Sequence, residues 1–523
     1  MNRKGSMGLL VAFAIMLNGC GIEDLFRDES AVVEKTVVQE LHECIVHMKD
    51  IWDKENQEDE LESSIDYLLD TMNESAARYS DMQLDYYADW NNTDLKTAYD
   101  AAYEEYYVIY EMLEWAFVNG AHKSKYADLF TPYASEEHAE YYLAYPLVRI
   151  ENFARDDSED YGGDLDDYYS AAYDEDVDVT NERELNDLNV ECAKLYLKTL
   201  KSYDLREYTY DTYVRDYTAQ DVSAVYKTIL SDFYPLCDAY YEALKSHPDY
   251  ARIRLKHNLK EKDPFKSILN YGSRLSPSIA ESAKKLYTEK LYYLASGSKC
   301  YDGSYTVAYP GRQSAKIYLY TDDSYIDLQN AIHEFGHFHS EWRDTTPIFL
   351  QKNCSDIAEV QSQGMQLLFT QYYDEIYGED ADFMEQLAVF DILDSIVSGF
   401  AIGEFEYQVM KQIDTISEYD VVDLFYEIAD SCNLERDLYE ISHLFEQPGY
   451  YISYGVSALA SLEIYGAMQE SPEQAVKLYE KISSVSSVDA KYGLREALSA
   501  CGFSDIFNPS DLDALLHKIP VLS

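Results

Sequence analysis

Two histidines and a glutamate in the segment His333-Glu334-Phe335-Gly336-His337 have the types and the spacing to bind a metal ion and activate water. On a helix, residues four positions apart project from the same face, so both imidazoles can reach one ion. A tetrahedral zinc ion takes two of its ligands in this way. Glu334 stands beside the first histidine, where its carboxylate can take a proton from a water molecule. The simpler interpretation is a surface helix with two histidines and a solvated acid.

A candidate third ligand favours the metal site over this simpler interpretation. Glu359 follows His337 with 21 residues between them, a gap that allows a second helix to fold back and offer a carboxylate. Two histidines and one glutamate leave the fourth position of zinc for water, which is the pattern of catalytic zinc sites. We therefore predict one Zn²⁺ per chain, held by His333, His337 and Glu359, with Glu334 as the general base.

Local patterns predict the elements that position these residues. Apolar residues at helical spacing from Leu328 to Phe335 indicate that the motif lies on a helix. Just upstream, the segment 317–320 is β-branched and aromatic, which indicates a short strand. Ser355 can cap a second helix with Asp356 in its first turn. From this first turn, we expect the Asp356 carboxylate to accept a hydrogen bond from a ligand histidine and so to orient it.

These motifs resemble a known family. The segment 333–337, followed by Asp-x-x-Glu-x-x-Ser-Gln at 356–363, is similar to the thimet oligopeptidase and oligoendopeptidase F family of zinc metallopeptidases. The segment 448–454, Pro-Gly-Tyr-Tyr-Ile-Ser-Tyr, resembles the tyrosine-rich substrate loop of that family, and His443 stands where its substrate-contacting histidine would be. One departure is visible, because the family often carries a histidine three residues after its second ligand, and this chain has Ser340 there.

The patterns and the resemblance together predict a mostly α protein with a small β patch before the motif helix, near residues 300–322. The resemblance implies a two-lobed zinc-peptidase architecture with a deep cleft, and internal cleavage of short peptides. We expect an N-terminal helical lobe at 20–190 and a catalytic lobe at 191–523.

The reaction places negative charge on the former carbonyl oxygen of the peptide, which calls for a hydroxyl donor beside the metal. Tyr454 is the first candidate for this donor, and Tyr451 and His443 follow it. Glu334 is expected to deprotonate the water and later to protonate the leaving amine.

The N-terminus predicts an exported lipoprotein. Arg3 and Lys4 precede an apolar run at 7–17 that is too short to span a bilayer comfortably. Leu-Asn-Gly-Cys at 17–20 then looks like a lipobox, so we expect residues 1–19 to be a lipoprotein signal peptide and Cys20 to carry the lipid anchor. The protein would be tethered to a bacterial cell membrane or envelope. An uncleaved membrane helix and an ordinary secretory signal are the alternatives.

The net charge limits the kinds of partner to expect, and the cysteine content bears on disulfide bonds. The net charge is −55, a field that repels nucleic acid, so we expect no nucleic-acid partner. The main effect of this charge is a strongly hydrated surface, and a preference for basic peptides is the weaker interpretation. The seven cysteines other than Cys20 are scattered singly, which argues against a disulfide framework.

Two other functions remain open at this point. A zinc carboxypeptidase or dipeptidyl carboxypeptidase of related fold would use the same ligands, but it would need a dedicated site for the C-terminal carboxylate of its substrate. A non-catalytic peptide-binding lipoprotein would be expected to have lost Glu334, which this chain retains.

Overall fold

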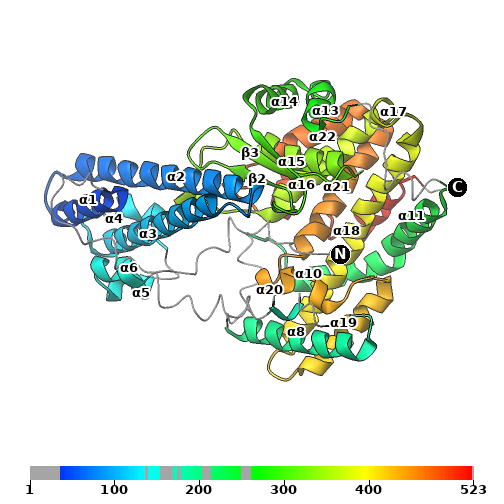
Figure 1. Ribbon diagram of the computed structural model, residues 1–523, viewed down its shortest axis with the longest axis horizontal. Coiled ribbons are helices and arrows are strands. Elements are labelled where there is room, and N and C mark those ends of the chain that lie inside the picture. Colours follow the sequence, from blue (N-terminus) through cyan, green and yellow to red (C-terminus); the bar gives the residue numbers. More distant parts are fainter. Residues whose placement is uncertain are drawn as a thin grey trace.

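The computed structural model describes residues 36–135, 139–153, 168, 170–172, 177, 179–202, 214–248, 261–324 and 326–520. The predicted signal peptide and the predicted lipid-bearing residue Cys20 lie outside these residues. Within them the chain is mostly helical, and a long helical arm extends from a larger helical body that holds one small sheet (Figure 1). This arrangement confirms the predicted mostly α, two-lobed fold.

The arm is built around two long helices, α2 (Glu58–Ala88) and α3 (Thr93–Lys123), which lie side by side (Figure 1). Neither contains proline, so nothing interrupts their backbone hydrogen bonds. The Asn92 side chain caps α3 by accepting hydrogen bonds from two backbone N–H groups in its first turn. The shorter helices of the arm are α1 (Val37–Ile51), α4 (Ala127–Phe130), α5 (Ala139–Ala144) and α6 (Leu147–Phe153). Their apolar faces share a core of their own with α2 and α3.

The body packs its helices around one long apolar helix, α18 (Ala381–Lys411). This helix contacts α10, α11, α19 and α21. Among the described residues, the helical stretch 378–411 is the one long and apolar enough to cross a membrane, and 72% of its most apolar window is buried inside the body, as in a core helix. The helices of the body are α8 (Glu182–Ser202), α10 (Ala219–Thr228), α11 (Tyr234–Ser246), α13 (Pro264–Gly272), α14 (Pro277–Glu289), α15 (Ile326–Glu341), α16 (Ser355–Phe369), α17 (Tyr373–Ile376), α18, α19 (Glu418–Cys432), α20 (His443–Glu446), α21 (Ile452–Glu470), α22 (Pro472–Ser483), α23 (Leu494–Cys501) and α24 (Pro509–Leu516).

A three-stranded mixed sheet precedes the motif helix α15. Its strands are β1 (Tyr292–Ala295), β2 (Tyr305–Ala308) and β3 (Ala315–Tyr320), in the spatial order β1-β3-β2. The central strand β3 pairs in parallel with β1 and antiparallel with β2. The predicted β patch is therefore confirmed, and β1 adds a strand that lies before the predicted range. The four residues of β1 carry too short a pattern to predict a strand without its pairing partner.

Aromatic contacts are among those that join the arm to the body. Tyr87 of α2 packs with Tyr301, Tyr305 and Tyr318 in a small cluster, and the Tyr318 hydroxyl donates to the backbone carbonyl of Tyr87 over 2.8 Å. Farther along the arm, Phe349 of the body stacks on Tyr110 of α3, with ring centroids 4.9 Å apart. Polar contacts along α2, such as those of Lys316 with Asp81 and of Tyr293 with Asp85, also hold the arm against the body. Part of the inner face of the arm lines the cleft described below.

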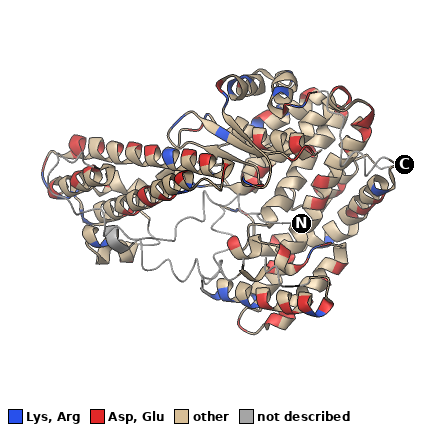
Figure 2. Cartoon of the chain, in the orientation of Figure 1, with Lys and Arg blue, Asp and Glu red and all other residues tan. Residues whose placement is uncertain are grey.

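The predicted domain bounds remain a prediction. The predicted boundary at residue 190 falls within α8, and residues on both sides of it, Leu188 and Cys192, pack into the larger core of the body. Acidic residues are spread over the helices of both the arm and the body (Figure 2), in keeping with the strongly negative sequence.

Candidate active site

The motif helix α15 is held by its apolar face. Leu328, Ile332 and Phe335 are fully or almost fully buried, and the helix contacts β2, β3, α13, α14 and α16. Glu334 and His337 line a cleft instead. The predicted strand-then-helix unit is therefore confirmed, and it turns the chemically useful face of the motif toward the cleft.

Gly336 sets the spacing between the motif helix and the next helix, α16. A Cβ atom at Gly336 would lie 2.6 Å from the Ser362 Cα atom and 2.7 Å from the Gln361 carbonyl oxygen. Real Cβ contacts with backbone do not come so close, so only glycine allows this approach of the two backbones. The close packing brings the carboxylate of Glu359 on α16 toward the two histidines of α15.

The two histidines and Glu359 converge as the sequence spacing indicates. The Glu359 Oε2 atom lies 3.4 Å from His333 Nε2 and 4.0 Å from His337 Nε2. One ligand atom from each of the three residues lies within 4.8 Å of the other two, and the described part of the chain contains no other such group of histidine, cysteine and acidic side chains. Two imidazole nitrogens and one carboxylate oxygen in this arrangement form a donor set that suits a zinc ion.

Hydrogen bonds orient two of the three ligands. The Nδ1 atom of His333 lies 3.1 Å from Gln366 Oε1, which leaves Nε2 to face Glu359. The Ser362 hydroxyl donates to Glu359 Oε2 over 3.1 Å. The prediction that Asp356 supports a ligand histidine is wrong, because its carboxylate instead binds other groups, chiefly the guanidinium of Arg215. Gln366 takes the expected role.

The pKa values of Glu359 and His337 suit binding of a cation, whereas a cation would have to displace a proton from His333. Burial lowers the pKa of His333, but the hydrogen bond and the charge of Glu359 outweigh it and raise that pKa to about 9. Burial alone would raise the pKa of Glu359, but its hydrogen bond with His333 and the charge of that histidine hold the pKa well below its usual value. Glu359 is therefore a carboxylate at neutral pH. Burial lowers the pKa of His337 to about 4, so this imidazole is neutral and keeps a lone pair for a metal.

The predicted base, Glu334, is buried beside the ligands and held by β2. The Thr306 hydroxyl donates to Glu334 Oε2 over 2.8 Å, and only 4% of Glu334 is exposed. Burial raises the pKa of its carboxyl group to about 7. A carboxyl group with a pKa near neutrality can both take and return a proton, as a general acid–base residue must.

In the tyrosine-rich loop, the hydroxyl group of Tyr450 lies next to the candidate ligand Glu359, and the predicted donor Tyr454 contacts His443. The Tyr450 hydroxyl lies 3.5 Å from Glu359 Oε1, and Tyr450 lines the cleft. The His443 ring stacks on Tyr450, with ring centroids 5.5 Å apart, and its Nε2 atom lies 3.4 Å from the Tyr454 hydroxyl. The Tyr451 hydroxyl accepts a hydrogen bond from Arg436 over 3.0 Å. The three predicted side chains, His443, Tyr451 and Tyr454, thus form one cluster with Tyr450, and Tyr450 is the member next to Glu359.

Three residues of the site were not predicted from the sequence. Gln366 lies seven residues after Glu359, two helical turns along the same face, and this spacing was a usable signal. Tyr450 directly follows the Pro-Gly pair of its loop, but nothing in the sequence ranks it above the neighbouring tyrosines. Thr306 reaches Glu334 only because β2 pairs with β3, so it carried no local signal.

The cleft has a volume of about 380 Å³ and lies between the arm and the body. Its lining includes Tyr106 and Tyr110 from α3, and strand β2, which stands at the edge of the sheet. Four glutamates also line it, and no lysine or arginine does so among the described residues. These glutamates are Glu114, Glu334, Glu341 and Glu359. The predicted deep cleft is present, and its charged walls are acidic.

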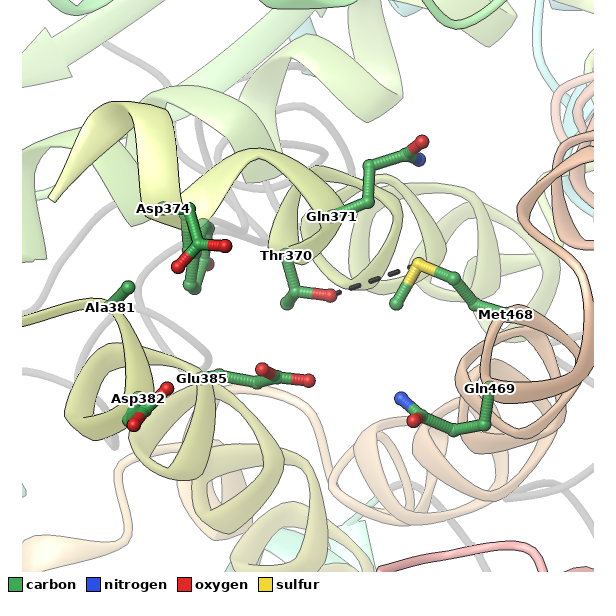
Figure 3. A pocket seen from close by; sticks show the side chains of 9 residues that line it. Thr370, Gln371, Asp374, Ala381, Asp382, Glu385, Met468 and Gln469 are labelled. Carbon is green, nitrogen blue, oxygen red and sulfur yellow. Dashed lines mark hydrogen bonds between the residues drawn. The ribbon is translucent and has the colours of Figure 1, made fainter. Parts of the chain in front are cut away.

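A second hollow, of about 260 Å³, lies apart from this cleft between the end of α16, α17, α18 and α21 (Figure 3). Asp374, Asp382 and Glu385 are among its lining residues, and the Thr370 hydroxyl contacts the Met468 sulfur at 3.8 Å. These three acids do not bring their oxygens close enough together to form a metal-binding group. The chemistry of the molecule therefore concentrates in the cleft with the histidines.

Comparisons with known proteins support the fold. No family model matches the chain, and no curated protein matches it. Solved structures do match it over nearly its whole length. A protein assigned as oligoendopeptidase F has a TM-score of 0.68 at 15% identity, with 94% of this chain and 96% of that chain covered.

Two further structures agree with this comparison. PZ peptidase A, solved with an inhibitor, has a TM-score of 0.66 at 14% identity over 93% of this chain and 98% of that one. A Bacillus anthracis protein assigned as oligoendopeptidase F has a TM-score of 0.63 at 15% identity over 96% and 97%. The resemblance found in the sequence motifs is confirmed in three dimensions, and the chain has the fold of the oligoendopeptidase F type.

Proposed function

We propose that this protein is a zinc-dependent endopeptidase that hydrolyses short oligopeptides. The observation that carries the proposal is the convergence of His333, His337 and Glu359 beside the buried Glu334, at the wall of a cleft. Two histidines, one carboxylate ligand and an adjacent glutamate base are the groups that metal-assisted peptide hydrolysis needs. The oligoendopeptidase F-type fold supports the same reaction class.

The roles of the side chains follow from their positions. His333, His337 and Glu359 would hold the zinc ion, which when bound supplies a Lewis acid and lowers the pKa of water beside it. Glu334 takes the proton of the attacking water, because its carboxylate is buried next to the ligands and has a pKa near neutrality. The same carboxyl group returns the proton to the leaving amine. The Tyr450 hydroxyl donates a hydrogen bond to the oxygen on which negative charge develops.

The walls of the cleft favour internal cleavage over removal of C-terminal residues. A carboxypeptidase or dipeptidyl carboxypeptidase needs a cation or a comparable donor set for the free carboxylate of its substrate. The described lining offers neither lysine nor arginine, so it supplies no such cation to bind a free carboxylate. Strand β2 lines the same cleft at the edge of the sheet, where an extended peptide can lie alongside its backbone.

The position of Glu334 also argues against a non-catalytic peptide-binding protein. A binding protein has no use for a buried carboxyl group beside three metal ligands, and burying such a group without a function costs free energy. Thr306 hydrogen-bonds this carboxyl group in place.

We propose a limit on substrate size from the position of the candidate metal ligands in a cleft between the arm and the body. Unfolding a protein domain typically costs about 5–15 kcal/mol, more than a cleft recovers by binding a few residues. Short flexible peptides avoid this cost, so we propose substrates on the order of 5–20 residues.

A set of three substrates with one cleavable sequence tests this proposal. The sequence is offered as a free peptide, as the same peptide with a C-terminal amide, and within an exposed loop of a stable protein. Mass spectrometry is expected to find the same internal cleavage in both peptides at similar rates, and little cleavage of the folded protein. Cleavage that requires the free carboxylate would support the carboxypeptidase alternative, and comparable rates on the folded protein would refute the size limit.

We also propose that the protein is exported and anchored through a lipid on Cys20. This proposal rests on the basic start, the short apolar run and the lipobox-like segment 17–20 of the sequence.

A further inference from the structure

A buried arginine just before α10 binds the helix that carries Glu359. The side chain of Arg215 and that of Asp356, in the first turn of α16, are both fully buried. Arg215 donates from Nε to Asp356 Oδ2 over 3.3 Å and from Nη2 to Oδ1 over 3.4 Å. The Tyr217 hydroxyl adds a bond of 2.8 Å to the same carboxylate. Asp356 lies three residues before Glu359, so this ion pair fixes the turn of α16 that presents the third ligand.

The same guanidinium also binds both sides of Tyr450. Its Nη1 atom donates to the Gly449 carbonyl oxygen over 2.7 Å, and Nη2 donates to the Ser453 hydroxyl over 2.7 Å. The Ser453 hydroxyl in turn donates to Asp356 Oδ1 over 2.6 Å. The Gly449 N–H group donates to Glu406 over 2.6 Å. The backbone before Tyr450 is therefore held by an arginine at its carbonyl and by a buried glutamate at its amide.

Two residues beside this network, Gly449 and Val214, have left-handed backbone conformations. Gly449 has a φ of +83°, a left-handed conformation that glycine adopts without strain. Val214, directly before Arg215, has a φ of +54°, which a β-branched residue rarely adopts. Strained residues of this kind persist where the surrounding contacts over-determine the backbone.

These contacts bear on the distance between the Tyr450 hydroxyl and the Glu359 carboxylate. Arg215 connects the first turn of α16, which positions Glu359, to the loop that carries Tyr450. The Tyr450 hydroxyl and Glu359 Oε1 lie 3.5 Å apart. The Asp356 carboxylate and the Arg215 guanidinium are buried and joined to each other and to their neighbours by several hydrogen bonds, and such a network favours one arrangement of the elements it joins. Arg215 itself is not among the described residues that line the cleft.

We propose that Arg215 is a positioning residue for the peptidase reaction, which holds the Tyr450 hydroxyl beside Glu359 without touching the substrate. The inference rests on the proposed function. The competing interpretation is that the buried ion pair only stabilises the fold. The two differ in whether the effect of disturbing Arg215 depends on the Tyr450 hydroxyl.

Ser453→Ala is the first variant, because it removes the two bonds of the Ser453 hydroxyl from the network and leaves the Arg215–Asp356 ion pair intact. We expect kcat on a short peptide to fall about fivefold and KM to change less than about twofold, since a small displacement of a catalytic group acts on the transition state. Arg215→Lys should lower kcat further, by about twentyfold or more. The lysine variant can unfold the chain, since it removes most of the donors from a buried site, and Ser453→Ala then carries the test.

The deciding measurement repeats Ser453→Ala in the Tyr450→Phe background. If Arg215 acts through the Tyr450 hydroxyl, removing that hydroxyl first leaves less than about a twofold further effect. An unchanged fivefold loss in that background would overturn the inference. So would loss of bound zinc from Ser453→Ala, because the effect would then act through the ligands.

Ser461→Ala is the matched control. Ser461 is also fully buried on α21, and its hydroxyl donates to the Val360 carbonyl oxygen over 3.4 Å, away from Arg215. This variant should keep kcat within about twofold of the unchanged protein. A fivefold loss here would show a general effect of helix packing and would overturn the inference. If the unchanged zinc-loaded protein hydrolyses no peptide, both the proposed function and this inference are wrong. If Ser453→Ala causes the same loss of kcat in the unchanged protein and in Tyr450→Phe, only the inference is wrong.

Discussion

At the scale of single residues, the identity of the hydroxyl donor depends on small differences within one aromatic cluster. Tyr454, the first candidate from the sequence, has its hydroxyl 3.4 Å from His443 Nε2, while the Tyr450 hydroxyl lies 3.5 Å from a metal-ligand carboxylate oxygen. Burial lowers the pKa of His443 to about 4, so this imidazole is neutral. It can accept a hydrogen bond from Tyr454 and stack on Tyr450. The geometry therefore favours Tyr450 over Tyr454 as the proposed hydroxyl donor.

Tyr450→Phe is expected to lower kcat by about a hundredfold with KM nearly unchanged, because the lost hydroxyl acts mainly in the transition state. Tyr454→Phe serves as the matched comparison and should cost less than about tenfold, since its hydroxyl is one contact removed from the ligands. Steady-state kinetics on one peptide measures both. A larger kcat loss in Tyr454→Phe than in Tyr450→Phe would restore the ranking suggested by the sequence.

At the scale of elements, the site depends on how closely α15 and α16 approach each other. The backbones meet at Gly336, where a side chain would collide with the Ser362 Cα atom. Moving α16 outward would carry Glu359 away from both histidines, which are 3.4 Å and 4.0 Å from it. If these three residues bind the proposed zinc ion, helix packing and metal binding are coupled through one glycine.

Gly336→Ala is expected to destabilise the fold by about 1–3 kcal/mol, as overpacking of a close contact usually does, and to weaken zinc binding. Denaturant unfolding and metal analysis of the purified protein measure the two effects. Gly272→Ala is a suitable control, because a Cβ atom there would make only ordinary contacts, at 3.5 Å or more. Full zinc occupancy together with unchanged stability in Gly336→Ala would show that the helix spacing does not control the ligands.

Much of this element-level arrangement could be predicted from the sequence. On a helix, the four-residue spacing of His333 and His337 places both side chains on one face. A second helix that folds back is enough to bring Glu359 to them. Contacts between distant segments could not be predicted, because their partners share no local pattern. Arg215 meets Asp356 across more than a hundred residues of chain, and the choice among the three loop tyrosines depends on the left-handed backbone of Gly449.

At the scale of the whole molecule, the arm and the body enclose an acidic cleft within a strongly acidic protein. The net charge of −55 repels nucleic acid and anionic lipid headgroups. A protein with this surface would stay at a membrane through an anchor rather than through its surface charge, which agrees with the proposed lipid on Cys20.

Cys20→Ser tests the anchor. The unchanged protein, expressed with its N-terminus in a bacterial host, is expected to partition into detergent and to carry diacylglycerol on the mature N-terminus. The serine variant should lose both properties, because the thioether bond requires the cysteine thiol and acyl chains supply the membrane affinity. Mass spectrometry of the N-terminal peptide and detergent partitioning measure this, and continued partitioning of the variant would contradict the lipoprotein proposal.

The most direct measurement of the central proposal is the zinc dependence of peptide cleavage, compared between the unchanged protein and Glu334→Gln. After chelation, one equivalent of zinc per chain should restore internal cleavage of short peptides by the unchanged protein. Glu334→Gln should bind the same amount of zinc and lose about a hundredfold or more in kcat, because the carboxylate is the base and not a ligand. Glu289→Gln, which changes an exposed ion pair with Lys285 on α14, should behave like the unchanged protein. Cleavage that survives complete removal of zinc, or a Glu334→Gln variant that keeps full turnover, would contradict the account.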